Sequence, residues 1–133
     1  MKRLVVAAVL AGALASSATA QKSLEASING MRDLITEPLA RWQNAGPAAC
    51  TNQDLTDASL SAIRLTSTLR PDKYGPGAAI KAGIWALDVG DAARKAGCRD
   101  VALRMYEHVM RAYVGSGFAG LRDRARVGID ALR

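Results

Sequence analysis

Residues 78–114 read AAIKAGIWALDVGDAARKAGCRDVALRMYEHVMRAYV, and this stretch decides the fold. Apolar side chains recur at steps of three to five residues on both sides of Gly97: Ile80, Ile84, Leu87 and Ala92 before it, and Val101, Met105, Val109 and Tyr113 after it. Such spacing places each set on one face of a helix. Gly97 suits the position just after a helix C-terminus. The stretch therefore predicts two helices, over about 78–96 and 100–114, joined by a tight turn.

The same periodicity predicts three further helices, over about 23–43, 54–69 and 118–132. Pro38 lies inside the first of these and is expected to kink or split it. In the second, Leu55, Leu60 and Ile63 are expected to face the core. β-branched residues do not alternate with polar ones, so no strand is predicted. We therefore expect an all-α protein: an antiparallel bundle of about five helices in a single domain over residues 21–133.

The first 20 residues have the three parts of a cleavable signal peptide. Lys2 and Arg3 form the positive start, residues 4–15 are an uncharged run of Leu, Val, Ala and Gly, and residues 18–20 read Ala-Thr-Ala. The alternative, a retained membrane anchor, would need about 20 apolar residues. We expect cleavage after residue 20, no transmembrane segment in the mature chain, and a periplasmic or secreted location. The short aliphatic signal and the Ala/Arg-rich composition favour a bacterial source.

The chain has two cysteines, Cys50 and Cys98. Exported proteins meet an oxidising compartment, in which paired cysteines usually form a bridge. Short connections make successive helices antiparallel, so the loops that hold these two residues are expected at the same end of the bundle. Compartment and topology together predict a Cys50–Cys98 disulfide. The alternative is two buried free thiols.

A short spacing pattern in the same stretch involves small residues and one aromatic residue: Val89, Gly90, Gly97, Ala102 and Tyr106. This arrangement resembles one degenerate copy of a tetratricopeptide (TPR) or Sel1-like repeat, over about residues 83–116. Gly90 and Ala102 would let the two helices approach, and Tyr106 would fill the gap to the next helix. The last predicted helix would cap the repeat.

If the resemblance holds, the inner face of the first repeat helix lines a groove for a peptide. On this chain that face is Leu87, Asp91, Arg94 and Lys95. The pattern also departs from the family, because Trp85 is one position out of place and Ala93 replaces a usual aromatic residue. The alternative is an ordinary helical hairpin with small residues at its crossing.

The basic balance of the chain, a formal net charge of +6, favours contact with anionic surfaces. It is too small to indicate a nucleic-acid partner. An alternative function follows from the last predicted helix, on which Arg122, Arg126 and Arg133 are expected to project from one side. These residues would bind anionic lipid or cell-wall polymer.

Motifs for catalysis, cofactors or metals are missing from the sequence. His108 is the single histidine, and the cysteines do not form a C-x-x-C pair. No catalytic, cofactor-binding or metal-binding residue is predicted. A small enzyme built around His108 stays as an alternative that would need a carboxylate and a hydroxyl within hydrogen-bond reach. The main hypothesis is a non-catalytic protein–protein interaction module with a protein or peptide partner in the cell envelope.

Overall fold

The computed structural model of the chain describes residue 19 and residues 22–46 and 49–133. Apart from Thr19, the predicted signal peptide therefore lies outside the described residues. The chain divides into two compact units, one ending at Met31 and one spanning Arg32–Arg133. In the first unit, residues 22–31 are helical.

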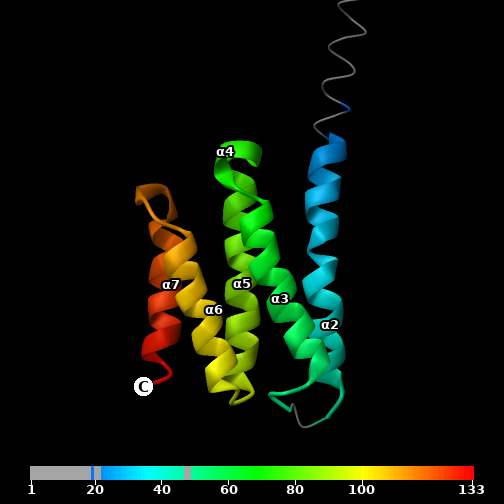
Figure 1. Cartoon of the computed structure of the whole chain (residues 1–133), viewed down its shortest axis with the longest axis vertical. Helices are drawn as coiled ribbons and strands as arrows, with labels where there is room; N and C mark the ends of the chain where they lie inside the picture. Colours follow the sequence, from blue (N-terminus) through cyan, green and yellow to red (C-terminus); the bar gives the residue numbers. More distant parts are fainter. Residues whose placement is uncertain (1–18, 20–21, 47–48) are drawn as a thin grey trace, which may run out of the picture. The chain divides into compact units, whose positions relative to one another are not determined.

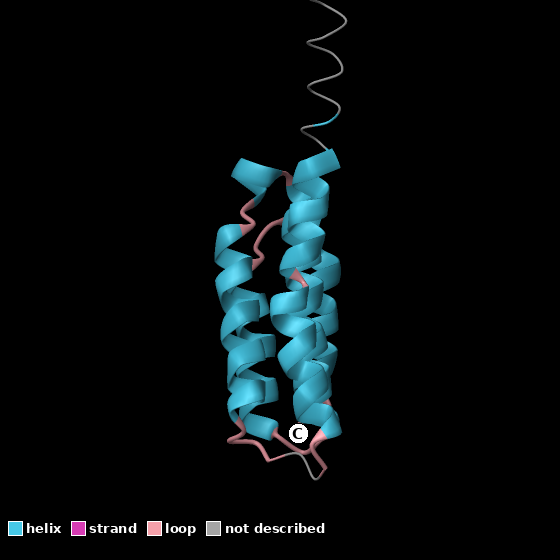
Figure 2. Ribbon diagram, turned by 90° about the vertical axis from the view of Figure 1, so that its right-hand side faces the viewer, coloured by secondary structure: helices cyan, strands magenta, loops and turns pink. Residues whose placement is uncertain are grey.

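The second unit is built from α-helices and one short 3-10 helix. The elements are α2 (Asp33–Asn44), α3 (Gln53–Thr68), α4 (Pro71–Tyr74), α5 (Pro76–Lys95), α6 (Arg99–Ala112), η1 (Ser116–Phe118) and α7 (Ala119–Asp130). Helix α5 lies between α3 and α6 (Figure 1), and it also packs against α7. The described residues contain no strand (Figure 2), so the predicted all-α bundle is confirmed.

Local chemistry explains where two of the helices begin. The Asn52 side chain accepts a hydrogen bond from the backbone N–H of Asp54 at 2.8 Å and caps α3. Helix α3 therefore begins at Gln53, one residue before the start predicted near residue 54. Pro76 opens α5, where its missing N–H costs nothing, and Gly75 supplies the left-handed φ of +88° just before it.

Pro38 lies inside α2 and does not split it. The helix runs through because Pro38 is buried on the same face as Ile35 and Trp42, and this face packs against α3. Trp42 also donates its indole N–H to the Ala49 carbonyl at 3.1 Å. The interruption in the predicted 23–43 helix lies at Arg32 instead, where a turn separates residues 22–31 from α2.

The core of the second unit depends on small side chains more than the periodicity indicated. On α5, the fully buried residues include Ala79, Ala82, Ala86 and Ala93, whereas Ile84 is 39% exposed. The prediction that Ile84 lies on the buried face of this helix is therefore wrong. Leu60 on α3, also expected in the core, is 51% exposed. Helix α5 has neighbours on several sides, so its short residues allow the neighbouring backbones to come close.

Tyr106 on α6 occupies the closest of these helix crossings. A Cβ atom added to Gly90 on α5 would lie 2.9 Å from the Tyr106 ring, and one added to Gly128 on α7 would overlap the ring. Tyr106 itself is fully buried. The close contact at Gly90 is therefore with Tyr106, whose ring reaches the next helix, α7, at Gly128. The repeat family stays a prediction.

Cys50 and Cys98 form a disulfide, as predicted, with their Cα atoms 5.3 Å apart. The α2–α3 and α5–α6 connections lie at the same end of the bundle (Figure 1), so the two cysteines can come as close as a disulfide requires. Cys98 is buried and Cys50 is exposed. A disulfide of this kind is typical of an oxidising compartment of the extracellular type.

Candidate functional site

The four residues of the predicted groove differ widely in their access to solvent. Leu87 is fully buried in the core, so its side chain offers no surface to a partner. Asp91 is partly exposed but already bound to other side chains of the bundle. Arg94 is partly exposed, and Lys95 is exposed at the last residue of α5. Only the basic end of the predicted face is therefore open to a ligand, and its binding role remains a prediction.

Asp91 is the centre of a polar cluster that joins three helices. The Tyr106 hydroxyl on α6 donates to Asp91 Oδ1 at 2.6 Å and accepts from Arg94 Nε at 3.0 Å. Arg124 on α7 donates through Nη2 to Asp91 Oδ2 at 2.7 Å and to Asp88 Oδ1 at 2.8 Å. Charge-assisted hydrogen bonds of this length are stronger than neutral ones. The cluster thus fixes α6 and α7 against α5.

These contacts also explain the direction of the pKa shifts. Burial alone would raise the pKa of Asp91, but hydrogen bonds from Arg124 and Tyr106 outweigh it, and the pKa is lowered. Burial and the bond to Asp91 raise the pKa of Tyr106. Both groups therefore keep their ordinary charge states at neutral pH. We assign a structural role to the cluster, because its polar atoms are hydrogen-bonded to one another.

Arg124 is a structural residue that the sequence analysis did not identify. It lies 33 residues from Asp91, and only the packing of α7 onto α5 brings the two together. The signal available in the sequence was weak. It consists of two aspartates one turn apart, Asp88 and Asp91, on a helix that is otherwise rich in alanine.

Two exposed cations flank the turn between α5 and α6: Lys95 is the last residue of α5, and Arg99 is the first residue of α6. Lys95 has no carboxylate partner among the described residues, and Arg99 donates through Nε to the Leu132 carbonyl at 3.3 Å. Arg99 also lines a hollow of about 380 Å³, whose other lining residues are the disulfide, Thr51 and residues 97, 100 and 101. We call Lys95, Arg99 and this hollow the disulfide-end surface.

The three arginines of the alternative anionic-surface hypothesis all have partners within the chain. Arg122 donates through Nη1 to the carbonyls of Tyr113 and Gly115, at 2.8 and 2.6 Å, and so caps the end of α6. Arg126 pairs with Asp123 at 3.3 Å, and Arg133 lies 4.0 Å from Asp130. These exposed pairs are weak, so Arg126 and Arg133 keep charge available to a ligand, whereas Arg122 has a structural task.

His108 has one of the two contacts that the enzyme alternative requires, a hydroxyl group within hydrogen-bond reach. Thr66 Oγ1 lies 2.6 Å from His108 Nε2 and also donates to the Ile63 carbonyl at 2.6 Å. Because a hydroxyl has a single proton, Thr66 accepts from Nε2–H of a neutral ring. Burial and then Arg111 lower the pKa of His108, which favours that form. Within the described part of the chain no carboxylate is hydrogen-bonded to His108, so this contact has the geometry of a helix–helix link.

Known proteins do not add to this description: no protein-family model, no curated protein and no solved structure matches the chain. Across residues 22–46 and 49–133 no cluster of three or more His, Cys, Asp or Glu side chains is placed to hold a metal ion. No helix among the described residues has both the length and the apolar character needed to span a bilayer.

Proposed function

We propose that the chain is an exported, non-catalytic protein–protein interaction module of the bacterial cell envelope, which binds an acidic segment of a partner protein at the disulfide-end surface. The observation that carries the proposal is a pair of exposed cations at this end of the bundle: Arg99 lines the hollow next to Cys50–Cys98, and Lys95, two residues before the lining residue Gly97, has no carboxylate partner among the described residues. Charge complementarity of this kind speeds encounter and selects partners.

The rigidity of this end of the bundle supports the proposal. The Cys50–Cys98 bridge ties the α2–α3 connection to the start of α6, and the Asp91 cluster fixes the last turns of α5. A surface that is already ordered loses little conformational freedom when it binds. Asp100 also lines the hollow. It lies in the first turn of α6, where the partial positive charge of the helix N-terminus offsets its carboxylate.

The location and the family are part of the same proposal. Residues 1–20 carry the pattern of an export signal, and a bridged cysteine pair fits the compartment to which such a signal leads. The TPR-like pattern over about residues 83–116 supports a binding role, because proteins that resemble it in spacing hold peptides along a pair of antiparallel helices. On this proposal the basic end of α5 is the part of that face that contacts the partner.

The test uses the oxidised protein and a fluorescein-labelled peptide of alternating Glu and Ala residues, with binding followed by fluorescence anisotropy. The double variant Lys95→Glu/Arg99→Glu should weaken binding by roughly tenfold or more, because each reversal replaces an attraction with a repulsion of about 1 kcal/mol. Arg94 is left intact, since its reversal would also disturb Tyr106 and Asp91.

The matched control is Arg64→Glu/Lys73→Glu, which makes the same change in net charge at exposed residues outside this surface. The proposal requires that this control bind the peptide nearly as well as the unmodified protein. Equal losses in both double variants would show that only net charge matters, and the proposed surface would be wrong.

The anionic-surface hypothesis is separated by vesicles that contain anionic lipid. Arg126→Gln/Arg133→Gln should weaken vesicle binding if that hypothesis holds, and added salt should weaken it steeply. Vesicle binding that depends on these two arginines, together with no binding of the acidic peptide, would replace the present proposal with the alternative.

A further inference from the structure

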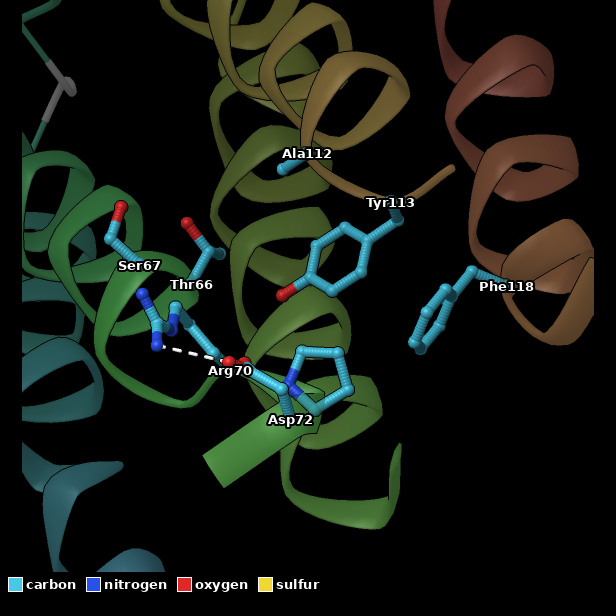
Figure 3. A pocket seen from close by; sticks show the side chains of 8 residues that line it. Thr66, Ser67, Arg70, Asp72, Ala112, Tyr113 and Phe118 are labelled. Carbon is cyan, nitrogen blue, oxygen red and sulfur yellow. Dashed lines mark hydrogen bonds and ion pairs between the residues drawn. The ribbon is translucent and has the colours of Figure 1, made fainter. Parts of the chain in front are cut away.

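A second hollow, of about 470 Å³, lies where the C-terminal end of α6 meets the end of α3, helix α4 and η1. Figure 3 shows its lining side chains, among them Thr66, Arg70, Tyr113 and Phe118. It is remote along α6 from Cys98, so it is distinct from the disulfide-end surface. Its volume falls in the range of small-molecule pockets.

Tyr113 brings an unsatisfied hydroxyl into this hollow. The residue is only 3% exposed, and its hydroxyl oxygen is buried without a hydrogen-bond partner. Buried polar groups nearly always have a partner, so an exception calls for an explanation. Burial raises the pKa of Tyr113 to about 12, and the group therefore stays a proton donor at neutral pH. What the site lacks is an acceptor.

The position of this hydroxyl is fixed from two sides. The Tyr113 ring packs edge-on against Phe118, with ring centroids 5.4 Å apart and planes at 62°. Arg122 holds the backbone carbonyl of Tyr113. In Figure 3 the hydroxyl points toward the side of the hollow where Thr66 and Arg70 lie. Thr66 is hydrogen-bonded to Ile63 and His108, and no hydrogen bond joins it to the Tyr113 hydroxyl.

The rim of the hollow supplies a cation and an apolar wall. Arg70 pairs with Asp72 at 3.0 Å, and both side chains are more than half exposed, so this ion pair exchanges readily with solvent or with a ligand. Pro71 and the ring of Phe118 provide apolar surface beside it. A buried donor, an exposed guanidinium and apolar walls are thus brought together in one place.

We propose that this hollow binds a small organic acid with an apolar body. One carboxylate oxygen accepts the Tyr113 O–H, the other pairs with Arg70, and the apolar body lies against Phe118 and Pro71. A carboxylate fits better than a neutral carbonyl, because it satisfies the tyrosine and also replaces Asp72 as the partner of Arg70. This inference is independent of the proposed function, which concerns the other end of α6.

The experiment is an NMR titration of the oxidised whole protein with benzoate, followed through backbone amide shifts. Benzoate should shift the amides of residues 66–72 and 112–118 and saturate in the millimolar range expected for so small a ligand. Benzamide has the same body without the charge, and acetate has the charge without the body. Both should bind at least about fivefold more weakly than benzoate.

Two variants and two matched controls test the contacts. Tyr113→Phe removes only the unpaired hydroxyl, and Arg70→Gln removes the cation. Each should weaken benzoate by about fivefold or more. Tyr74→Phe and Arg64→Gln make the same chemical changes outside the hollow and should leave the affinity unchanged.

The folding of the variants is checked separately by circular dichroism and thermal melting. Tyr113→Phe is expected to fold, because the hydroxyl that it removes has no partner to lose. The proposal is overturned if benzoate produces no saturating shifts in this region. It is also overturned if a folded Tyr113→Phe protein binds benzoate as tightly as the unmodified one, which would mean that the hydroxyl does not bind the carboxylate.

Discussion

A single methyl group added at Gly128 should destabilise the bundle strongly. A Cβ atom at this position would overlap the far end of the Tyr106 ring. The ring cannot retreat, because Gly90 of α5 is on its other side and its hydroxyl is held by Asp91 and Arg94. Helix α7 must therefore shift outward, or the hydrogen bonds of Tyr106 must break.

The size of the effect follows from three contributions. Overpacking a tight contact costs about 1–3 kcal/mol. Loss of the bond from Tyr106 to the Asp91 carboxylate adds about 1.5–3 kcal/mol. The better helix propensity of alanine returns at most about 1 kcal/mol. The net expectation for Gly128→Ala is a loss of about 1.5–5 kcal/mol in the free energy of unfolding, or a fall in Tm of order 10 °C.

Gly120 provides the matched control on the same helix. A Cβ atom there would meet nothing within 4 Å. Gly120→Ala should therefore leave stability unchanged or raise it by a few tenths to about 1 kcal/mol. Guanidinium titration and thermal melting, both followed by far-UV circular dichroism, measure the two variants side by side.

A third variant identifies the ring as the cause. Tyr106→Leu removes the outer ring atoms that Gly128→Ala would strike, so the alanine should cost less in this background, by at least about 1 kcal/mol. The reasoning is refuted if Gly128→Ala is as stable as Gly120→Ala, or if its cost is the same with leucine at position 106.

Three further predictions concern the bridge and two ionisable groups. Replacing Cys50 and Cys98 by alanine should lower the free energy of unfolding by about 4 kcal/mol, the loop-closure value for a separation of 48 residues; a loss below about 1 kcal/mol in guanidinium titration would contradict it. The lowered pKa of Asp91 stabilises the fold fully above its ordinary value of 3.8, and this contribution disappears as the pH falls through the folded-state pKa. Asp91→Asn should therefore flatten the acid limb of stability against pH, and an unchanged limb would exclude this role. Because the pKa of Tyr113 rises from 10.0 to about 12, its contribution is complete below pH 10 and is lost between these two values. Tyr113→Phe should remove that alkaline loss without lowering stability at neutral pH, as urea titrations on both sides of the range would show.

Helices α3, α5, α6 and α7 and the disulfide could be predicted from the sequence because they depend on local or topological rules. Apolar spacing and glycine turns give the helices to within a few residues. The bridge follows from antiparallel neighbours joined by short loops, which place Cys50 and Cys98 at one end. The export signal stays a prediction, because residues 1–18 and 20 lie outside the described residues.

The buried face of α5 could not be predicted from the apolar stripe alone. A stripe of large residues indicates one buried face, as it correctly did for Met105 and Val109 on α6. Helix α5 contacts α3, α6 and α7, so small residues on several sides are buried while Ile84 remains 39% exposed. Alanine is equally compatible with a core and with an exposed helix surface, and its placement depends on neighbours that the sequence does not specify.

The candidate sites were harder to predict because their chemistry depends on helices that are distant in sequence. Asp91 was expected to face a peptide, and instead it binds Tyr106 and Arg124 from two other helices. No local pattern distinguishes a free aspartate from a paired one. The unpartnered hydroxyl of Tyr113 was likewise invisible, since its periodicity correctly indicated only that the ring is buried.

The two tyrosines of α6 show how the same residue type gives opposite results at two places on one helix. Tyr106 packs against two glycines, Gly90 and Gly128, which have no side chain in its way. Its hydroxyl can therefore form hydrogen bonds with Asp91 and Arg94. Tyr113 lies at the helix end, where its ring meets Phe118 and its hydroxyl stops short of any partner. A paired hydroxyl locks the helices together, whereas an unpaired one leaves a donor available. Tyr106 therefore fixes the middle of α6 against its neighbours, and the donor proposed to bind a ligand, Tyr113, lies at the end of the helix.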